Sequence, residues 1–192
     1  MKVNDSGMPE ESYWNSLFNI PTILDWLNIK NINAPIVEIG CGYGTFTLPI
    51  AKSAKNKIYS FDIEQKMVEI TRKKIESAGL TRVELTCRDI IKKTTGLKPN
   101  SVGMVLLFNI LHSEERKLFL EESYRILKSS GIAAVIHWRK DIPTPRGPLV
   151  HLRPDEKIIV NTIKGMDFQI QENSTILPPY HWGIQLVKGG KI

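Results

Sequence analysis

A loop with three glycines, Gly40, Gly42 and Gly44, constrains the fold of this chain more than any other feature. It follows an apolar segment and precedes a helical pattern, and in such a turn a ligand can approach the backbone because no Cβ stands in the way. The loop does not match the dinucleotide-binding pattern G-x-G-x-x-G, since the sixth position is a threonine whether it is counted from Gly40 or from Gly42. The spacing G-x-G-x-G lacks the pyrophosphate pattern and favours a nucleoside ligand without phosphate.

Apolar segments and amphipathic helical patterns alternate along the chain, which predicts an α/β fold with a mainly parallel sheet. The expected strands are residues 35–39, 57–61, 83–87, 102–108, 132–137, 168–171 and 183–187. The expected helices are residues 11–27, 64–78, 113–127 and 154–164, with a further helix beginning at Thr45. Pro21 is expected to kink or divide the first helix. The strand 102–108 is almost wholly apolar, which is typical of a central strand covered on both faces.

Length and composition favour a single globular domain, with 192 residues, 42% hydrophobic and 24% charged. The chain has no apolar run of the length that a membrane helix needs, and its first residues do not resemble a secretory signal, so a cytoplasmic location is expected. Two cysteines predict neither a disulfide framework nor a metal site. The net charge of +6 is spread over short lysine and arginine runs, which favours a solvated basic surface over an RNA-binding footprint.

Two acidic residues follow predicted strands. Asp62 lies 22 residues after Gly40, at the end of the second strand, where a carboxylate can accept hydrogen bonds from both ribose hydroxyls. Asp89 follows the third strand. Ligands of open α/β sheets bind outside the carboxyl ends of the strands, so the two acids and the glycine loop are expected to converge. The alternative for either acid alone is a helix N-cap.

The run from Val37 to Gly44 resembles the first motif of class I S-adenosylmethionine-dependent methyltransferases of the UbiE/type 11 kind. Residues 61–62, 87–90, 108–112 and 127–131 resemble later elements of that family, and the resemblance covers roughly residues 35–138. It implies a Rossmann-like, seven-stranded sheet of order 3-2-1-4-5-7-6, with the last strand antiparallel and helices on both faces. It also implies S-adenosyl-L-methionine as cofactor and S-adenosyl-L-homocysteine as product. The Ser129-Ser130-Gly131 turn departs from the glycine pair that the family has there.

The resemblance further implies which residues bind the cofactor. They are Glu38, Gly40, Cys41, Gly42, Gly44, Asp62, Ile63, Asp89, Ile90, Asn109 and Leu111. Glu38 and the Asn109 carbonyl would meet the ammonium group, the glycines would pass the methionine part, and Leu111 would line the methionyl chain. Asp62 would take the ribose diol and Asp89 the adenine amine, with the isoleucine after each aspartate contacting the adenine ring.

The methyl acceptor is less constrained, because methyl transfer is an in-line displacement in which proximity and orientation carry most of the catalysis. Candidate catalytic residues at the same rim are His112, His137, Tyr180 and His181. Candidate substrate-side residues are Arg146 and His151, with Tyr13 and Trp14 as parts of a lid. Each of these histidines is also compatible with a structural role, and no ligand spacing predicts a metal.

We therefore expect a single methyltransferase domain, residues 1–192, that acts on a small-molecule acceptor as a monomer or homodimer. Its expected parts are an N-terminal helical cap (1–30), a cofactor-binding core (35–138) and a substrate-side loop, helix and closing strands (139–192). Two alternatives stay open: an RNA or protein methyltransferase that uses the basic surface, and a non-catalytic protein that binds S-adenosylmethionine.

Overall fold

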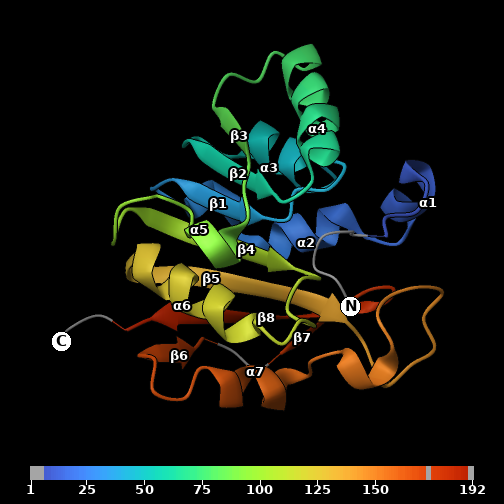
Figure 1. Cartoon of the computed structure of the whole chain (residues 1–192), viewed down its shortest axis with the longest axis vertical. Helices are drawn as coiled ribbons and strands as arrows, with labels where there is room; N and C mark the ends of the chain where they lie inside the picture. The colour runs from blue at the N-terminus through green and yellow to red at the C-terminus, as the bar shows by residue number, and fades with distance from the viewer. Residues whose placement is uncertain (1–6, 172–173, 190–192) are drawn as a thin grey trace.

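A computed structural model describes residues 7–171 and 174–189, and within them eight strands form one mixed sheet (Figure 1). The strands are β1 (Ile36–Ile39), β2 (Ile58–Asp62), β3 (Val83–Cys87), β4 (Val102–Phe108), β5 (Leu127–Trp138), β6 (Phe168–Ile170), β7 (Thr175–Leu177) and β8 (His181–Lys188). Their order is β3-β2-β1-β4-β5-β8-β6, and β7 pairs with β8 outside this path. The predicted fold class is thus confirmed, with one strand more than expected.

Strand direction brings the predicted site residues together. Ile36 of β1 lies opposite Ile58 of β2 and Met104 of β4, and both pairings are parallel. The sheet continues parallel to β3 on one side and to β5 on the other. Only then does β8 run antiparallel to β5, as expected for the closing strand. The residues that follow β1, β2, β3 and β4 therefore lie at one edge of the sheet.

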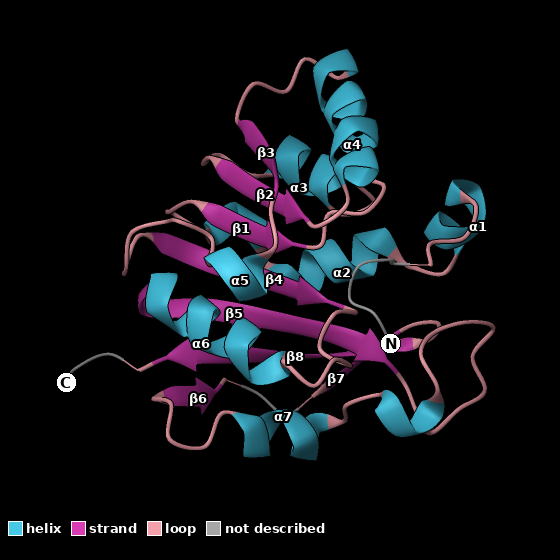
Figure 2. Cartoon of the chain, viewed as in Figure 1, coloured by secondary structure: helices cyan, strands magenta, loops and turns pink. Residues whose placement is uncertain are grey.

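Helices cover both faces of the sheet, as Figure 2 shows. They are α1 (Glu11–Ser16), α2 (Ile20–Leu27), α3 (Thr47–Ser53), α4 (Gln65–Ser77), α5 (Ile90–Lys93), α6 (Arg116–Ile126) and α7 (Glu156–Thr162), with 3₁₀ turns at Ile29–Asn31 and Val150–Leu152. Alternate residues of the central strands contribute to two separate cores, for example Leu106 to the core under α2, α3 and α4, and Leu107 to the core under α5, α6 and α7. In residues 7–171 and 174–189, no helix combines the length and the apolar character that a membrane span requires.

The first predicted helix is divided, as the position of Pro21 predicted, and another predicted helix is displaced along the chain. The helix expected over residues 11–27 is divided into α1 and α2, because the side chain of Asn19 caps α2 by accepting from the Thr22 amide (3.2 Å) and Pro21 occupies its first turn. The helix expected over residues 113–127 begins three residues later, and its expected last residue, Leu127, is already the first residue of β5. The division into cap, core and substrate-side parts stays a prediction. Its residues 1–6, 172–173 and 190–192 lie outside the described residues.

Candidate cofactor and acceptor site

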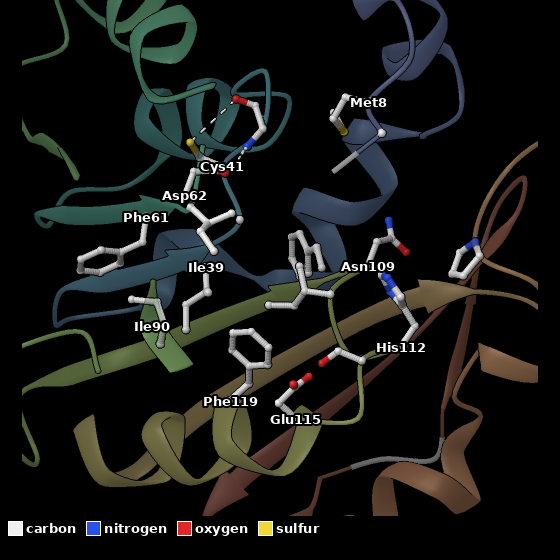
Figure 3. Close-up of a pocket in the computed structure, with 18 of the residues that line it drawn as sticks. Met8, Ile39, Cys41, Phe61, Asp62, Ile90, Asn109, His112, Glu115 and Phe119 are labelled. Atoms are coloured by element: carbon white, nitrogen blue, oxygen red, sulfur yellow. Dashed lines mark hydrogen bonds between the residues drawn. The ribbon is translucent and has the colours of Figure 1, made fainter. Parts of the chain in front are cut away.

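A cavity of about 710 Å³ opens at the carboxyl ends of β1, β2 and β4. Figure 3 shows Cys41 and Asp62 on one side of this cavity, Asn109 and His112 on another, and Glu115 with Phe119 on a third. The size is within the range of small-molecule and cofactor sites in proteins. The cavity lies where ligands of open α/β sheets bind, so it is the candidate functional site.

The glycine loop is held against the end of β2. The amides of Gly40 and Cys41 both donate to the Phe61 carbonyl, at 2.7 and 3.0 Å, and the Gly42 amide donates to the carboxylate of Asp62 at 2.8 Å. Gly40 has a φ of +88°, a left-handed conformation that favours glycine. Gly40, Cys41 and Gly42 line the cavity, so the loop presents backbone to any molecule bound there.

Gly44, the third glycine, lies outside the cavity wall and has a structural reason to lack a side chain. Its φ is +76°, and a Cβ at this position would approach Cγ2 of Thr71 in α4 to 2.9 Å. Thr71 also donates its hydroxyl to the Gly42 carbonyl at 2.9 Å. The last turn of the loop is therefore packed tightly on α4.

Both predicted acids line the cavity. Asp62 is buried and accepts the amides of Gly42 and Glu64, one on each oxygen, at 2.8 and 3.0 Å. Burial raises the pKa of its carboxyl, and these two amides oppose the shift. The Asp89 carboxylate caps α5 through the Lys92 amide at 3.2 Å, and that hydrogen bond and the Lys92 side chain hold its pKa below the usual value against the opposing effect of burial. Asp89 thus takes the N-cap position and also faces the cavity.

Glu38 lies below the cavity wall and is only 2% exposed. Its Oε2 accepts the hydroxyls of Thr47 and Ser60, at 2.5 and 2.6 Å. Its Oε1 is buried and has no hydrogen-bond partner among the described residues. Burial raises the pKa of Glu38 to about 7, and the charge of Asp62 adds to the shift. Glu38 does not itself line the cavity, so its predicted contact with an ammonium group stays a prediction.

The remaining predicted cofactor residues divide into two groups. Ile63, Ile90 and Asn109 line the cavity, and both polar atoms of the Asn109 amide are buried without a partner among the described residues. Asn109 also has a φ of +57°, which is uncommon outside glycine and concentrates at functional sites. Leu111 is fully buried in the core under α6 and does not line the cavity, so the structure does not support its predicted contact with a methionyl chain.

Of the four catalytic candidates only His112 lines the cavity. His137 lies behind it, fully buried, with the two rings edge to face at 5.6 Å. His181 is also fully buried and stacks on Phe18 at 4.5 Å, and burial lowers its pKa to about 3. Tyr180 packs beside the buried core. None of the three lines the cavity. His137 in β5 and His181 in β8 point into the interior, whereas Tyr180 precedes β8 and is half-buried.

The substrate-side candidates also divide. Trp14 of α1 and Arg146 of the loop after β5 both line the cavity. The Arg146 guanidinium also donates to the Gly7 carbonyl. Tyr13 is 42% exposed, and His151 is exposed on the Val150–Leu152 turn; neither lines the cavity. On a helix, successive side chains point in different directions, so only one of the two aromatic neighbours on α1 can face inward.

Most of the apolar wall of the cavity was not predicted from the sequence. It consists of Met8, Ile39, Phe46, Phe61, Phe108 and Trp138, among others. Phe108 and Trp138 are the last residues of β4 and β5, so their position at the carboxyl ends of two central strands was a signal that could have found them. Met8 contacts the loop from the N-terminal segment, and nothing in its local sequence indicates this.

The wall fits a nucleoside that carries a positive charge. It combines a glycine loop, two strand-end carboxylates and apolar side chains that can cover a purine. Among residues 7–171 and 174–189, no group of three or more histidine, cysteine or acidic side chains is placed to hold a metal. Fold and site together define a nucleoside-binding α/β domain.

Comparison with known proteins gives the family. The methyltransferase domain family matches residues 36–131, half of the chain. A solved S-adenosylmethionine-dependent methyltransferase from Aquifex aeolicus is similar over 97% of this chain and 95% of its own, with a TM-score of 0.78 and 22% identity. The chain belongs to the methyltransferase domain family, which confirms the predicted class, the class I S-adenosylmethionine-dependent methyltransferases.

Two curated relatives are similar to parts of the chain. The tRNA N(3)-methylcytidine methyltransferase trm140 of Schizosaccharomyces pombe is 27% identical over 58% of this chain and 39% of its own length. The ubiquinone/menaquinone biosynthesis C-methyltransferase UbiE of Wigglesworthia glossinidia brevipalpis is 28% identical over 62% of this chain and 49% of its own length. The chain thus spans less than half the length of either, and the two relatives are named for different acceptors.

Proposed function

We propose that this protein transfers the methyl group of S-adenosyl-L-methionine to a small-molecule acceptor by in-line displacement. The observation that carries the proposal is the set of polar groups Asp62, Asp89 and Asn109 on the wall of one cavity beside the glycine loop. Membership of the methyltransferase domain family supports S-adenosyl-L-methionine as the cofactor that binds in this cavity.

The protein's own residues bind and orient the cofactor. Asp62 accepts the ribose hydroxyls while keeping its two backbone amides, and Asp89 takes the adenine amine. The Asn109 carbonyl accepts a hydrogen bond from the ammonium group, and the carboxylate of Glu38, next to the lining residue Ile39, attracts it. The bound cofactor supplies an electrophilic methyl group, and the protein contributes mainly by fixing the acceptor near it in a site that excludes water.

The N-terminal segment supports a small acceptor rather than a macromolecule. It crosses the cavity from the glycine loop, where the Tyr43 hydroxyl donates to the Pro9 carbonyl at 2.7 Å, to the loop after β5, where Arg146 donates to the Gly7 carbonyl. Thr45 donates to the Asn15 side chain at 2.6 Å. These contacts narrow the access that a folded RNA or a protein would need.

The charge of the cavity wall supports the same choice. The charged side chains that line it are Asp62, Asp89, Glu114, Glu115, Arg88 and Arg146. Carboxylates therefore outnumber guanidinium groups four to two, although the whole chain carries a net charge of +6. Phosphates are bound by lysine and arginine, so this wall suits an uncharged or cationic acceptor better than a nucleic acid.

A transfer assay with three pools tests the proposal. The purified protein is incubated with methyl-labelled S-adenosyl-L-methionine and, separately, a metabolite extract, total RNA or a protein extract, with Asp62→Ala as the inactive control. We expect label in the small-molecule fraction only. Label in RNA or protein would instead favour the macromolecular alternative. No transfer to any pool, by a protein that binds S-adenosyl-L-homocysteine, would favour a non-catalytic binding protein.

A further inference from the structure

Four of the side chains that line the cavity are aromatic rings packed in two pairs, and they form what we call the aromatic compartment. Trp14 and Trp138 lie edge to face with their centroids 6.3 Å apart, and Phe46 and Phe108 do so at 4.9 Å. All four line the cavity, although they come from α1, the end of β5, the start of α3 and the end of β4. Aromatic walls favour flat aromatic ligands, which pack against ring faces and edges. This compartment is therefore suited to a planar ring.

His112 is the one histidine among the described cavity-lining residues. Its Nδ1 is buried and has no hydrogen-bond partner among the described residues. Burial lowers the pKa of His112, the positive charge of Arg116 lowers it further, and the backbone of Asn109 opposes the shift. The imidazole is thus neutral near neutral pH and is able to accept a proton.

The surroundings of His112 also bear on its role. His137 of β5 faces its ring from behind and is itself kept neutral, because burial lowers its pKa well below the usual value. Arg116 of α6 donates to the Leu111 carbonyl at 3.0 Å, which fixes the turn that carries His112. The carboxylates of Glu114 and Glu115 line the cavity from the same loop. These two acids disfavour an acceptor that carries a carboxylate of its own.

We propose that the acceptor is an aromatic compound with a hydroxyl group, and that His112 is the base that takes the hydroxyl proton. This inference rests on the proposed methyltransferase function. The acceptor oxygen forms its bond to the methyl carbon while the carbon–sulfur bond breaks and its electron pair stays on sulfur. The hydroxyl proton moves to the imidazole of His112 and later to solvent. A neutral, weakly acidic hydroxyl is the group that gains most from such a base.

Binding provides a test that does not depend on turnover. The probes are phenol, benzoate and aniline, each titrated by calorimetry into the protein saturated with S-adenosyl-L-homocysteine. We expect phenol to bind and benzoate not to bind. Trp14→Ala should weaken phenol binding about 2- to 10-fold through the loss of one aromatic contact. Tyr13→Ala is the matched control and should leave phenol binding unchanged. Tyr13 is the residue before Trp14, but its side chain is exposed and does not line the cavity.

Kinetics with two phenols tests the base. Phenol keeps its proton at mildly alkaline pH, whereas 4-nitrophenol is largely ionised there and needs no base. His112→Gln should lower the rate of phenol methylation about 10²- to 10⁴-fold, which is the usual contribution of a positioned base, and change that of 4-nitrophenol much less. His151→Gln is the matched control, since that histidine is exposed and does not line the cavity.

The outcomes separate this inference from the proposed function. An equal loss with both phenols, or no loss, would overturn the role of His112. Binding of S-adenosyl-L-homocysteine without binding or methylation of any phenol, or transfer to aniline alone, would overturn the acceptor class and leave the methyltransferase proposal intact. Failure to bind S-adenosyl-L-homocysteine would overturn both.

Discussion

Replacing Asp62 by alanine tests the cofactor-binding wall most sharply. In the structure this carboxylate accepts the Gly42 and Glu64 amides, and each of its oxygens retains capacity for a further hydrogen bond toward the cavity. We propose that the two ribose hydroxyls of the cofactor use this capacity. Asp62→Ala removes both of these bonds and also releases the glycine loop from the end of β2.

The expected loss follows from the burial of the carboxylate. Asp62 is 8% exposed, so water competes little for it. A hydrogen bond to a charged group contributes roughly 1.5–3 kcal/mol, so two of them correspond to about 3–6 kcal/mol. At about 1.4 kcal/mol per factor of ten, the affinity should fall about 10²- to 10⁴-fold.

The assay is calorimetric titration with S-adenosyl-L-homocysteine, with circular dichroism to check that the variant is folded. Asp141→Ala is the matched control, because this aspartate is exposed, pairs with Arg139 and does not line the cavity. A ligand without the 2′-hydroxyl should bind the wild type more weakly but bind Asp62→Ala no worse than the normal ligand does. A folded Asp62→Ala protein that binds within about twofold of the wild type would refute the reasoning, since even one lost bond exceeds that.

Three further predictions concern the loop and its surroundings. Burial raises the pKa of Glu38 to about 7, above its value of about 4.3 in the unfolded chain, so its contribution to stability is present below pH 4.3 and is lost as the pH rises through 7. The unfolding free energy of Glu38→Gln, measured by urea titration, should therefore vary less with pH between these values than that of the wild type. Equal pH dependence of the two proteins would contradict this. Gly44→Ala should lower the unfolding free energy by about 1–3 kcal/mol, because its Cβ would meet Thr71 at a positive φ; an unchanged urea midpoint would argue against this packing. Iodoacetamide should label the exposed Cys87 in the native protein, but should label Cys41 only after unfolding, because burial raises the pKa of the Cys41 thiol. If mass spectrometry finds both cysteines labelled in the native protein, the glycine loop is open.

The sequence predicted the sheet well because its signals are local. Apolar runs end at the glycine loop, Asp62 and Asp89, and the parallel order places these ends at one edge, where the cavity lies. The extra strand β7 was missed because a strand of three residues is too short to give a periodic signal. The early start of β5 at Leu127 was missed because the turn residues around Gly131 indicated a loop, whereas pairing with Val102 extends the strand through them.

The acceptor side was predicted less well, since it depends on the direction of single side chains. His112 and His137 come from neighbouring strands and both were expected at the rim, yet only His112 faces the cavity. Leu111 lies next to His112 in the turn after β4 but points into the core, and no periodic pattern in a turn indicates which of the two faces the cavity. The aromatic wall joins Trp14 and Trp138, which are far apart in the sequence, so no local pattern indicates that they meet.

The central claim is that the cavity beside the glycine loop binds S-adenosylmethionine, and calorimetric titration of the wild-type protein tests it most directly. We predict that S-adenosyl-L-methionine and S-adenosyl-L-homocysteine each bind at one site per chain, and that NAD gives no binding heat, because the loop lacks the pyrophosphate pattern. Binding of NAD in place of these two ligands, or no binding of either, would contradict the claim.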